Sequence, residues 1–223
     1  MAEGTLMSNP EDQAVRFFLV RHGETADNIE MRYLGTRDEP LTDHGMRQAA
    51  LVAEALSQLP IRIVVSSPLR RAADTAERIR KARGVKLRLD SRLAEGSFGS
   101  WEGLTRTEVL NLGSRDAALL DHWESEPSFA PPGGESIENV QKRMVELAEE
   151  LKREFSGSSL ALVSHVGPIK ALLAAVLAVP LLAARRLFLD PGTISVVEWG
   201  ARPFLRLFNS HAHLGWPSAR WMR

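Results

Sequence analysis

Three short apolar runs, each followed by polar residues and then by a helical pattern, constrain the fold of this chain most. They are Val15–Val20 (VRFFLV), Ile61–Val65 (IRIVV) and Leu160–Val163 (LALV). Buried strands that alternate with helices are typical of α/β proteins. We therefore expect an α/β fold, with a mainly parallel central sheet and helices on both of its faces.

Weaker patterns extend this sheet. A further strand is expected at Val85–Leu89, and a C-terminal pair of strands at Ile194–Trp199 and Phe204–Phe208. The most apolar stretch of the chain, Ile169–Ala184, contains a lysine and is broken by Pro180. It is too short and too interrupted to span a bilayer, so it predicts a buried helix.

Capping residues mark where three helices should begin. Thr42 can cap a helix that runs to about Leu59, and Ser136 can cap another. The pair Ser67–Pro68 places a capping hydroxyl before a first-turn proline, and Gly84 is a natural end for the helix that follows.

Composition excludes several functional classes. The 223 residues hold 28 Lys+Arg and 28 Asp+Glu, so no net charge attracts nucleic acid or a membrane. The chain has no cysteine, which excludes disulfides, thiolate metal sites and a cysteine nucleophile. Residues Met1–Gln13 lack both a basic start and an apolar stretch, and predict a flexible arm rather than a signal peptide. We expect a cytoplasmic protein without nucleic-acid or membrane partners, and the sequence leaves a homodimer open.

Chemically useful side chains follow all three main strands. The first run is followed by Arg21–Thr25, the second by Ser66–Arg71, and the third by Ser164–Gly167. Ligands of open α/β sheets bind outside the carboxyl ends of the strands. Two histidines and several arginines should therefore gather at one edge of the sheet, and this coincidence is the main functional signal.

The arginines favour an anion site. A guanidinium group offers a planar fork of donors that matches phosphate or carboxylate. Arg21 and either Arg70 or Arg71, together with the free amides of the helix expected after Ser67, would bind an anion strongly.

The histidines favour phosphoryl chemistry at such a site. A neutral imidazole at His22 is a competent nucleophile toward phosphorus, and His165 could hydrogen-bond the phosphoryl oxygens. The departing oxygen needs a proton, so a carboxylic acid should lie close by.

Blander interpretations compete with this hypothesis. Two histidines could bind zinc, but no Asp or Glu lies beside His165, and Arg21 beside His22 would repel a cation. Arg70 and Arg71 could form a solvated helix face. The remaining histidines lie away from the strand ends and are assigned to the surface or to packing: His44, His122, His211 and His213.

Six motifs in order resemble the histidine phosphatase superfamily, the phosphoglycerate mutase-like group. The most specific is Leu19–Thr25 (LVRHGET) with Asn28 after it. The stretch Phe98–Gly103 (FGSWEG) is similar to the phosphatase branch that includes alpha-ribazole phosphatase-like proteins. The other similar segments are Asp38–Gly45, Ser66–Ala76, Arg92–Glu95, Pro132–Ser136 and Val163–Gly167.

The resemblance implies a metal-independent phosphatase that uses no cofactor. His22 would be the nucleophile that becomes phosphohistidine, and Glu95 the acid that protonates the leaving oxygen and then activates water. It also selects Arg71 over Arg70. Val166 stands where the family usually has glycine, but its amide can still serve. The implied phosphate contacts are Arg21, Asn28, Arg71, His165 and Val166.

The resemblance also implies an organisation and a substrate class. Residues 14–223 would form one catalytic domain, a three-layer sandwich with a helical cap insertion around 105–132. That insertion should select a small phosphorylated metabolite. Two other functions stay open: a phosphoglycerate mutase-type phosphotransferase, and a non-catalytic phosphate-binding module.

Overall fold

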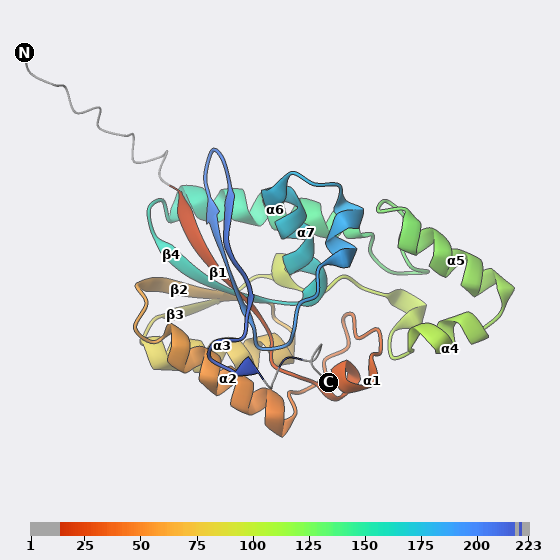
Figure 1. The fold of residues 1–223 in the computed structure, drawn as a ribbon, viewed down its shortest axis with the longest axis horizontal. Helices are drawn as coiled ribbons and strands as arrows, with labels where there is room; N and C mark the ends of the chain where they lie inside the picture. The colour runs from red at the N-terminus through yellow and green to blue at the C-terminus, as the bar shows by residue number, and fades with distance from the viewer. Residues whose placement is uncertain (1–13, 217–218, 220–223) are drawn as a thin grey trace, which may run out of the picture.

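A six-stranded mixed sheet forms the centre of the computed structural model, which describes residues 14–216 and 219 (Figure 1). The expected N-terminal arm lies outside these residues. The first four strands across the sheet are parallel, and the last two are antiparallel to their neighbours. The expected mainly parallel sheet is thus confirmed. In spatial order the strands are β3 (Lys86–Leu89), β2 (Ile61–Ser66), β4 (Ser159–Ser164), β1 (Val15–Arg21), β5 (Ile194–Trp199) and β6 (Phe204–Ser210).

Helices cover both faces of the sheet, as expected. One face carries α2 (Asp43–Leu56) and α3 (Arg70–Arg83), and the opposite face carries α6 (Ile137–Glu154) and α7 (Val166–Leu177) (Figure 1). Shorter elements surround the carboxyl ends of the strands. These are α1 (Ala26–Glu30), α4 (Arg106–Asn111), α5 (Ser114–Ser125), and the 3-10 turns Ser91–Leu93, Gly99–Trp101 and Leu181–Arg186.

The apolar runs are continuous because the central strands are buried on both faces. In β1, Phe17 and Leu19 pack with the core beneath α6 and α7, whereas Phe18 and Val20 pack with the core beneath α2 and α3. This division follows the period of two along a strand. A third, smaller apolar cluster around Trp101 lies among α4, α5 and the neighbouring loops.

The first turn of α3 differs from the expectation. The helix begins at Arg70 rather than directly after Ser67, because Leu69 keeps an extended backbone with φ −62° and ψ 132°. The Ser67 hydroxyl accepts a hydrogen bond from the Leu69 amide at 3.2 Å, so it closes the turn ahead of the helix instead of capping it.

Two other helix ends are also corrected. The helix capped by Thr42 ends at Leu56, short of Leu59. The buried helix expected over 169–184 ends at Leu177, and Ala178 adopts a left-handed backbone with φ 51°. A helix rarely continues to the residue before a proline, and the chain resumes after Pro180 as a 3-10 turn.

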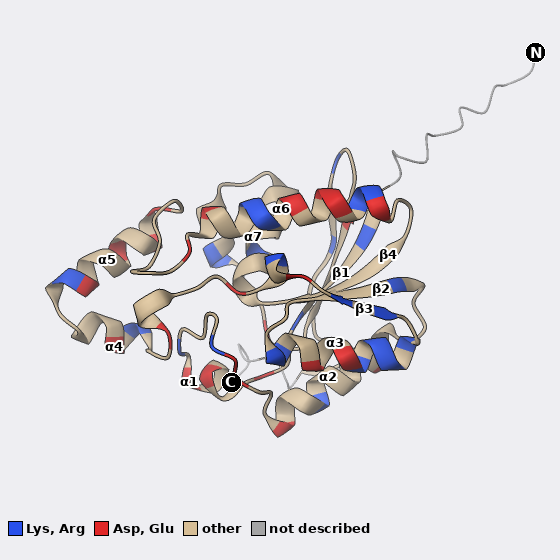
Figure 2. Cartoon of the chain, turned by 180° about the vertical axis from the view of Figure 1, so that it is seen from behind, with Lys and Arg blue, Asp and Glu red and all other residues tan. Residues whose placement is uncertain are grey.

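Charged residues of both signs are interspersed along α5 and α6, and Figure 2 shows this mixture from the back of the molecule. Within the described part of the chain, no helix is long and apolar enough to cross a membrane. Residues 105–132 contain α4 and α5, while the division into one domain with a cap insertion stays a prediction.

Leu147→Ala tests the core beneath α6. The Leu147 side chain is 1% exposed and lies in the larger apolar cluster, so truncation leaves a cavity. We expect the free energy of unfolding in urea to fall by about 2–5 kcal/mol. The exposed neighbour provides the control, since Glu146→Ala should change it by less than about 0.5 kcal/mol. Equal small effects would contradict the packing described.

Candidate active site

Strand pairing brings the three polar strand ends together. β1 and β4 are parallel, with Arg21 beside Ser164 in the register. The backbone continues this pairing past both strands, because the His22 amide donates to the Ser164 carbonyl at 3.0 Å. The Ser67 amide likewise donates to the Val163 carbonyl at 3.0 Å. The sequence segments that follow β1, β2 and β4 therefore meet at one edge of the sheet.

His22 is buried as a neutral ring. Its Nδ1 lies 2.7 Å from the Gly23 carbonyl oxygen, and because a carbonyl only accepts, Nδ1 carries the proton. Nε2 is therefore the nitrogen with the lone pair. Burial, and then the charges of Arg71 and Arg21, hold the His22 pKa well below its usual value. The ring thus stays an unprotonated nucleophile in mildly acidic solution.

His165 packs against His22, with 4.9 Å between the ring centroids. Its Nε2 lies 2.8 Å from the Ser67 hydroxyl oxygen, and its buried Nδ1 has no hydrogen-bond partner among the described residues. Burial, together with the charges of His22 and the nearby arginines, lowers the His165 pKa. A buried nitrogen without a partner is suited to an oxygen ligand that enters the site.

The structure separates the two arginines that the sequence pattern left open. Arg71 is fully buried, and its two terminal nitrogens donate to the Arg37 carbonyl at 2.6 Å and the Gly35 carbonyl at 2.7 Å. Arg70 has a side chain that is 60% exposed and pairs with Asp74. Arg71 is therefore the arginine of the α3 start that lies within the site.

The anion site expected at the α3 amides is corrected by an internal carboxylate. The Arg70 amide donates to Asp38 Oδ1 at 2.7 Å, so this first-turn amide already has an anionic partner. A second cationic group does come from β1, since the Arg21 guanidinium is held at the Leu189 carbonyl. Arginine side chains, rather than the Arg70 amide, supply the positive charge of the site.

Glu95 enters the site from the loop after the 3-10 turn Ser91–Leu93. Its carboxylate accepts hydrogen bonds from the Gly96 amide at 2.9 Å and the Gly167 amide at 3.2 Å. A Cβ atom at position 167 would lie 2.3 Å from Glu95 Oε1, so this close approach requires glycine. Neither strand periodicity nor helix periodicity marks Glu95, and only its motif could have found it.

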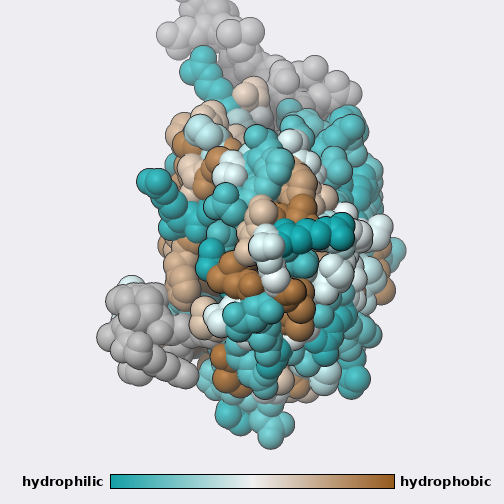
Figure 3. Space-filling model, turned by 90° about the vertical axis from the view of Figure 1, so that its right-hand side faces the viewer, coloured by the Kyte–Doolittle hydropathy of each residue, from teal (hydrophilic) through white to brown (hydrophobic). Residues whose placement is uncertain are grey.

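A cavity of about 620 Å³ collects most of the expected site residues. His165 is not among the residues that line it and contacts the His22 ring instead. Figure 3 looks onto the side of the molecule with α1, α4 and α5, and shows apolar residues near its centre surrounded by hydrophilic ones. The expected residues that line the cavity are Arg21, His22, Asn28, Arg71, Glu95 and Val166.

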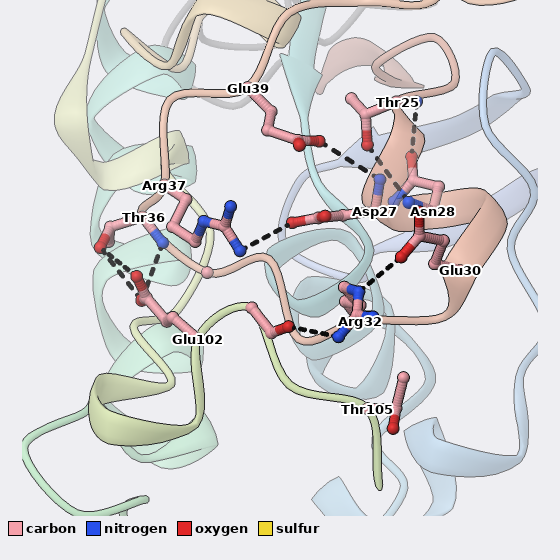
Figure 4. A network of polar contacts seen from close by, with 12 residues as sticks. Thr25, Asp27, Asn28, Glu30, Arg32, Thr36, Arg37, Glu39, Glu102 and Thr105 are labelled. Carbon is pink, nitrogen blue, oxygen red and sulfur yellow. Dashed lines mark hydrogen bonds and ion pairs between the residues drawn. The ribbon is translucent and has the colours of Figure 1, made fainter. Parts of the chain in front are cut away.

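A polar network fixes the loop that holds Arg71 (Figure 4). Arg37 pairs with the buried Asp27 at 3.3 Å, and the Glu102 carboxylate accepts from the Thr36 amide at 2.9 Å. Arg32 donates to Glu108 at 2.7 Å. Because these contacts join α1, the loop after it and the start of α4, the carbonyl oxygens that orient Arg71 are held in place.

The chain after β6 supports His22 from a second loop. The Gly192 amide donates to the carbonyls of Arg21 at 3.1 Å and His22 at 3.0 Å. His213 Nε2 donates to the Gly192 carbonyl at 2.8 Å, and the buried His211 lies 2.9 Å from Asp190. Both histidines have the packing role assigned to them from sequence.

Pattern analysis missed three residues of the site. Ser67 holds His165, although its position suggested only a helix cap. Thr75 links two catalytic segments, because its hydroxyl accepts from the Gly23 amide at 3.2 Å and donates to the Arg71 carbonyl at 2.8 Å. Lys170 also lines the cavity, and its signal was a single cation within the most apolar stretch of the chain.

Comparison with protein families agrees with this geometry. The description "Histidine phosphatase superfamily (branch 1)" matches residues 17–210. The chain belongs to this superfamily. The resemblance carried by Leu19–Thr25 is confirmed, and the cavity at the strand ends is this family member's candidate active site.

Relatives extend over most of the chain. Phosphoserine phosphatase 1 of Hydrogenobacter thermophilus is 32% identical over 203 residues, 90% of this chain and 95% of the relative. The solved structure of a mycobacterial glucosyl-3-phosphoglycerate phosphatase has a TM-score of 0.79 at 32% identity, with 87% of this chain and 99% of that chain covered. A putative alpha-ribazole-5'-P phosphatase of Escherichia coli has a TM-score of 0.79 at 30% identity, with 89% and 98% covered.

Some relatives are longer than this chain. Proteins of Mycobacterium tuberculosis and Mycobacterium bovis, one of them named a bifunctional protein, share 37% identity over 202 residues. Those residues are 89% of this chain and 55% of the relatives, so the chain spans about half of their length.

The buried histidines predict a loss of stability in mild acid. An unfolded histidine takes up a proton below its usual pKa of 6.5, whereas folded His22 does so only at a much lower pH. The folded state therefore loses roughly 1 kcal/mol per such histidine as the pH falls from 7.5 to 5.5. Urea unfolding of His22→Asn should show a smaller loss than the original chain by about this amount. Asp90 and Glu150, with pKa values of about 2, titrate below this window. The same loss in both proteins would contradict the assignment.

Proposed function

We propose that this chain is a hydrolase, a metal-independent phosphomonoesterase that acts on a small phosphorylated metabolite through a phosphohistidine at His22. One observation carries the proposal. A buried neutral imidazole, whose Nδ1 proton is held by a backbone carbonyl, lines a cavity together with two guanidinium groups. The printed names of the family relatives, phosphoserine phosphatase and glucosyl-3-phosphoglycerate phosphatase, support the reaction class.

In the first step, His22 Nε2 attacks phosphorus, and the bond between phosphorus and the ester oxygen breaks. Protonated Glu95 gives its proton to that oxygen, so the substrate leaves as an alcohol. Arg21 and Arg71 neutralise the charge that gathers on the phosphoryl oxygens. The further contacts in this proposal are Asn28, the Val166 amide and the His165 ring nitrogen.

In the second step, water replaces the alcohol. The Glu95 carboxylate accepts a proton from water, the new bond between oxygen and phosphorus forms, and the bond between phosphorus and Nε2 breaks. His22 returns to its neutral form and Glu95 to its acid form, so atoms and charges balance over the cycle. Because the arginines disfavour a protonated His22, they also favour the neutral ring as the leaving group.

Hydrolysis competes with transfer to a second alcohol, the phosphoglycerate mutase-type reaction. Both share the phosphohistidine, and they differ in whether water or an alcohol accepts the phosphoryl group. Release of inorganic phosphate in the absence of an acceptor alcohol supports the phosphatase. A non-catalytic phosphate-binding module would bind phosphate without turnover.

His22→Asn should abolish turnover of phenyl phosphate, because asparagine has no ring nitrogen to attack phosphorus. We expect kcat to fall by at least about a thousandfold, measured as phosphate release with EDTA present in every assay. His44→Asn is the matched control, since this histidine lies outside the cavity, and it should retain activity. Activity that survives loss of His22, or that needs added metal, would refute the mechanism.

Glu95→Gln should slow poor leaving groups most. Glutamine cannot donate a proton to the departing oxygen, so an alkyl phosphate should lose about a hundredfold or more in kcat/KM. 4-Nitrophenyl phosphate, whose phenolate leaves without a proton, should lose much less in single-turnover burst experiments. An equal loss for both esters would show that Glu95 is not the general acid.

A further inference from the structure

A second cavity, of about 230 Å³, adjoins the active-site cavity. We call it the side cavity, and it lies among the loop at 95–98, α5, α6, α7 and the 3-10 turn Leu181–Arg186. Four residues line both cavities: Glu95, Phe98, Val166 and Lys170. The two spaces therefore meet at the carboxylate that would protonate the leaving group.

The walls of the side cavity are mostly apolar. Trp123 reaches it from α5, and the Arg185 guanidinium covers the Trp123 ring at 4.2 Å from its centroid. The volume is below the range of about 300–1,000 Å³ typical of pockets for drug-sized ligands. The space suits a short aliphatic group. The apolar residues of the lining include Ile137, Val140, Ala171, Leu181 and Ala184.

Two of the charged residues in the side cavity are already held by protein partners. The Glu135 carboxylate accepts two hydrogen bonds from the Arg143 guanidinium, at 2.9 and 3.0 Å. Arg185 Nη2 donates to the Trp123 carbonyl at 2.6 Å. These pairings leave little capacity for an incoming ligand.

Lys170 differs from these residues. It lies on α7, is half-buried, and makes no hydrogen bond or ion pair to any residue that the structure describes. Burial, and then the charge of Arg21, lowers the Lys170 pKa to about 8. An ammonium group that stands at the junction of two cavities without a partner is poised to pair with a ligand anion.

We propose that Lys170 and the side cavity form a subsite for the leaving group, which selects phosphate monoesters whose alcohol carries a carboxylate on a short aliphatic chain. The proposal rests on the proposed function, because Glu95 then fixes the place of the ester oxygen. From that oxygen the alcohol extends past Glu95 into the side cavity. Its methylene groups contact the apolar walls, and its carboxylate pairs with Lys170.

A carboxylate fits this subsite better than a second phosphate group. A phosphate would bring up to two negative charges close to Glu95 and Glu135, against one ammonium group without a partner. A carboxylate carries a single charge that one ammonium can balance.

The test compares two matched esters, 3-(phosphonooxy)propanoate and its primary amide, which differ only in the charge at the far end. The original chain should prefer the acid in kcat/KM by about tenfold at pH 7, the loss expected when one partner of a partly buried charge pair is removed. Lys170→Met should abolish this preference through KM, and Lys170→Arg should restore part of it. Lys142→Met, at an exposed position on α6, is the control and should keep the preference.

The pH dependence gives a second readout. The preference should fall as the pH rises through about 8, where the Lys170 ammonium loses its proton. An equal loss for acid and amide in Lys170→Met would overturn the subsite, because Lys170 would then act through Glu95. No preference in the original chain would overturn it as well.

Failure of the proposed function is recognised separately. Phenyl phosphate carries no carboxylate, so its hydrolysis tests the phosphatase alone. If no ester is hydrolysed, calorimetric binding of 4-phosphonobutanoate and its amide still tests the subsite. The acid should bind about tenfold more tightly than the amide, and Lys170→Met should remove that difference. Equal binding of the two would overturn the proposal.

Discussion

The parallel pairing of β1 with β4 is the constraint on which the rest of the site depends. Neither strand carries a reactive group within its buried part, but the register places Arg21 beside Ser164 and lets the His22 amide bond the Ser164 carbonyl. The two histidine rings then meet at 4.9 Å, although 143 positions separate them in the sequence (165 − 22). A slip of one residue would turn one ring to the opposite face of the sheet.

The site is held by the backbone rather than by partner side chains. Arg71 is oriented by two carbonyl oxygens, Arg21 by a third, and the His22 ring by a fourth. Carbonyl oxygens orient these groups without neutralising the arginines, so the cavity keeps a positive charge for an anion. The same charge and the same burial keep His22 neutral. Affinity for the phosphoryl group and nucleophilicity thus have one physical origin.

This arrangement lowers the stability of the folded chain in exchange for reactivity. Two buried histidines cannot take up protons in mild acid, and buried nitrogens of Arg71 and His165 have no partner among the described residues. Both features are costs that a bound phosphate would relieve. The polar network around Asp27, Arg37 and Glu102 offsets part of this cost by fixing the loop at the cavity rim.

The sequence specified the sheet well, because the central strands are buried on both faces and read as continuous apolar runs. The expected run Ile194–Trp199 is β5 in full, and the other main strands differ by one or two residues at their ends. The α3 start was misplaced because Ser67 satisfies both a turn and His165, and a capping pattern cannot show the second partner.

The individual site residues were harder to predict than the sheet edge. Arg70 and Arg71 are adjacent on one helix, and only the packing of the loop at 35–37 decides which of them is buried. Glu95 has no periodic signal, and Lys170 gains its meaning from a cavity formed by segments distant in sequence. Such properties depend on tertiary packing, which a local pattern does not contain.

The most direct test of the central claim is to trap the covalent intermediate. The chain is mixed with a phosphate monoester, quenched in alkali within milliseconds, digested, and analysed by mass spectrometry for a phosphorylated histidine. The account predicts a single phosphohistidine at His22, formed and lost at rates consistent with turnover. Turnover without any phosphohistidine, or a phosphoryl group found on His165 instead, would contradict it.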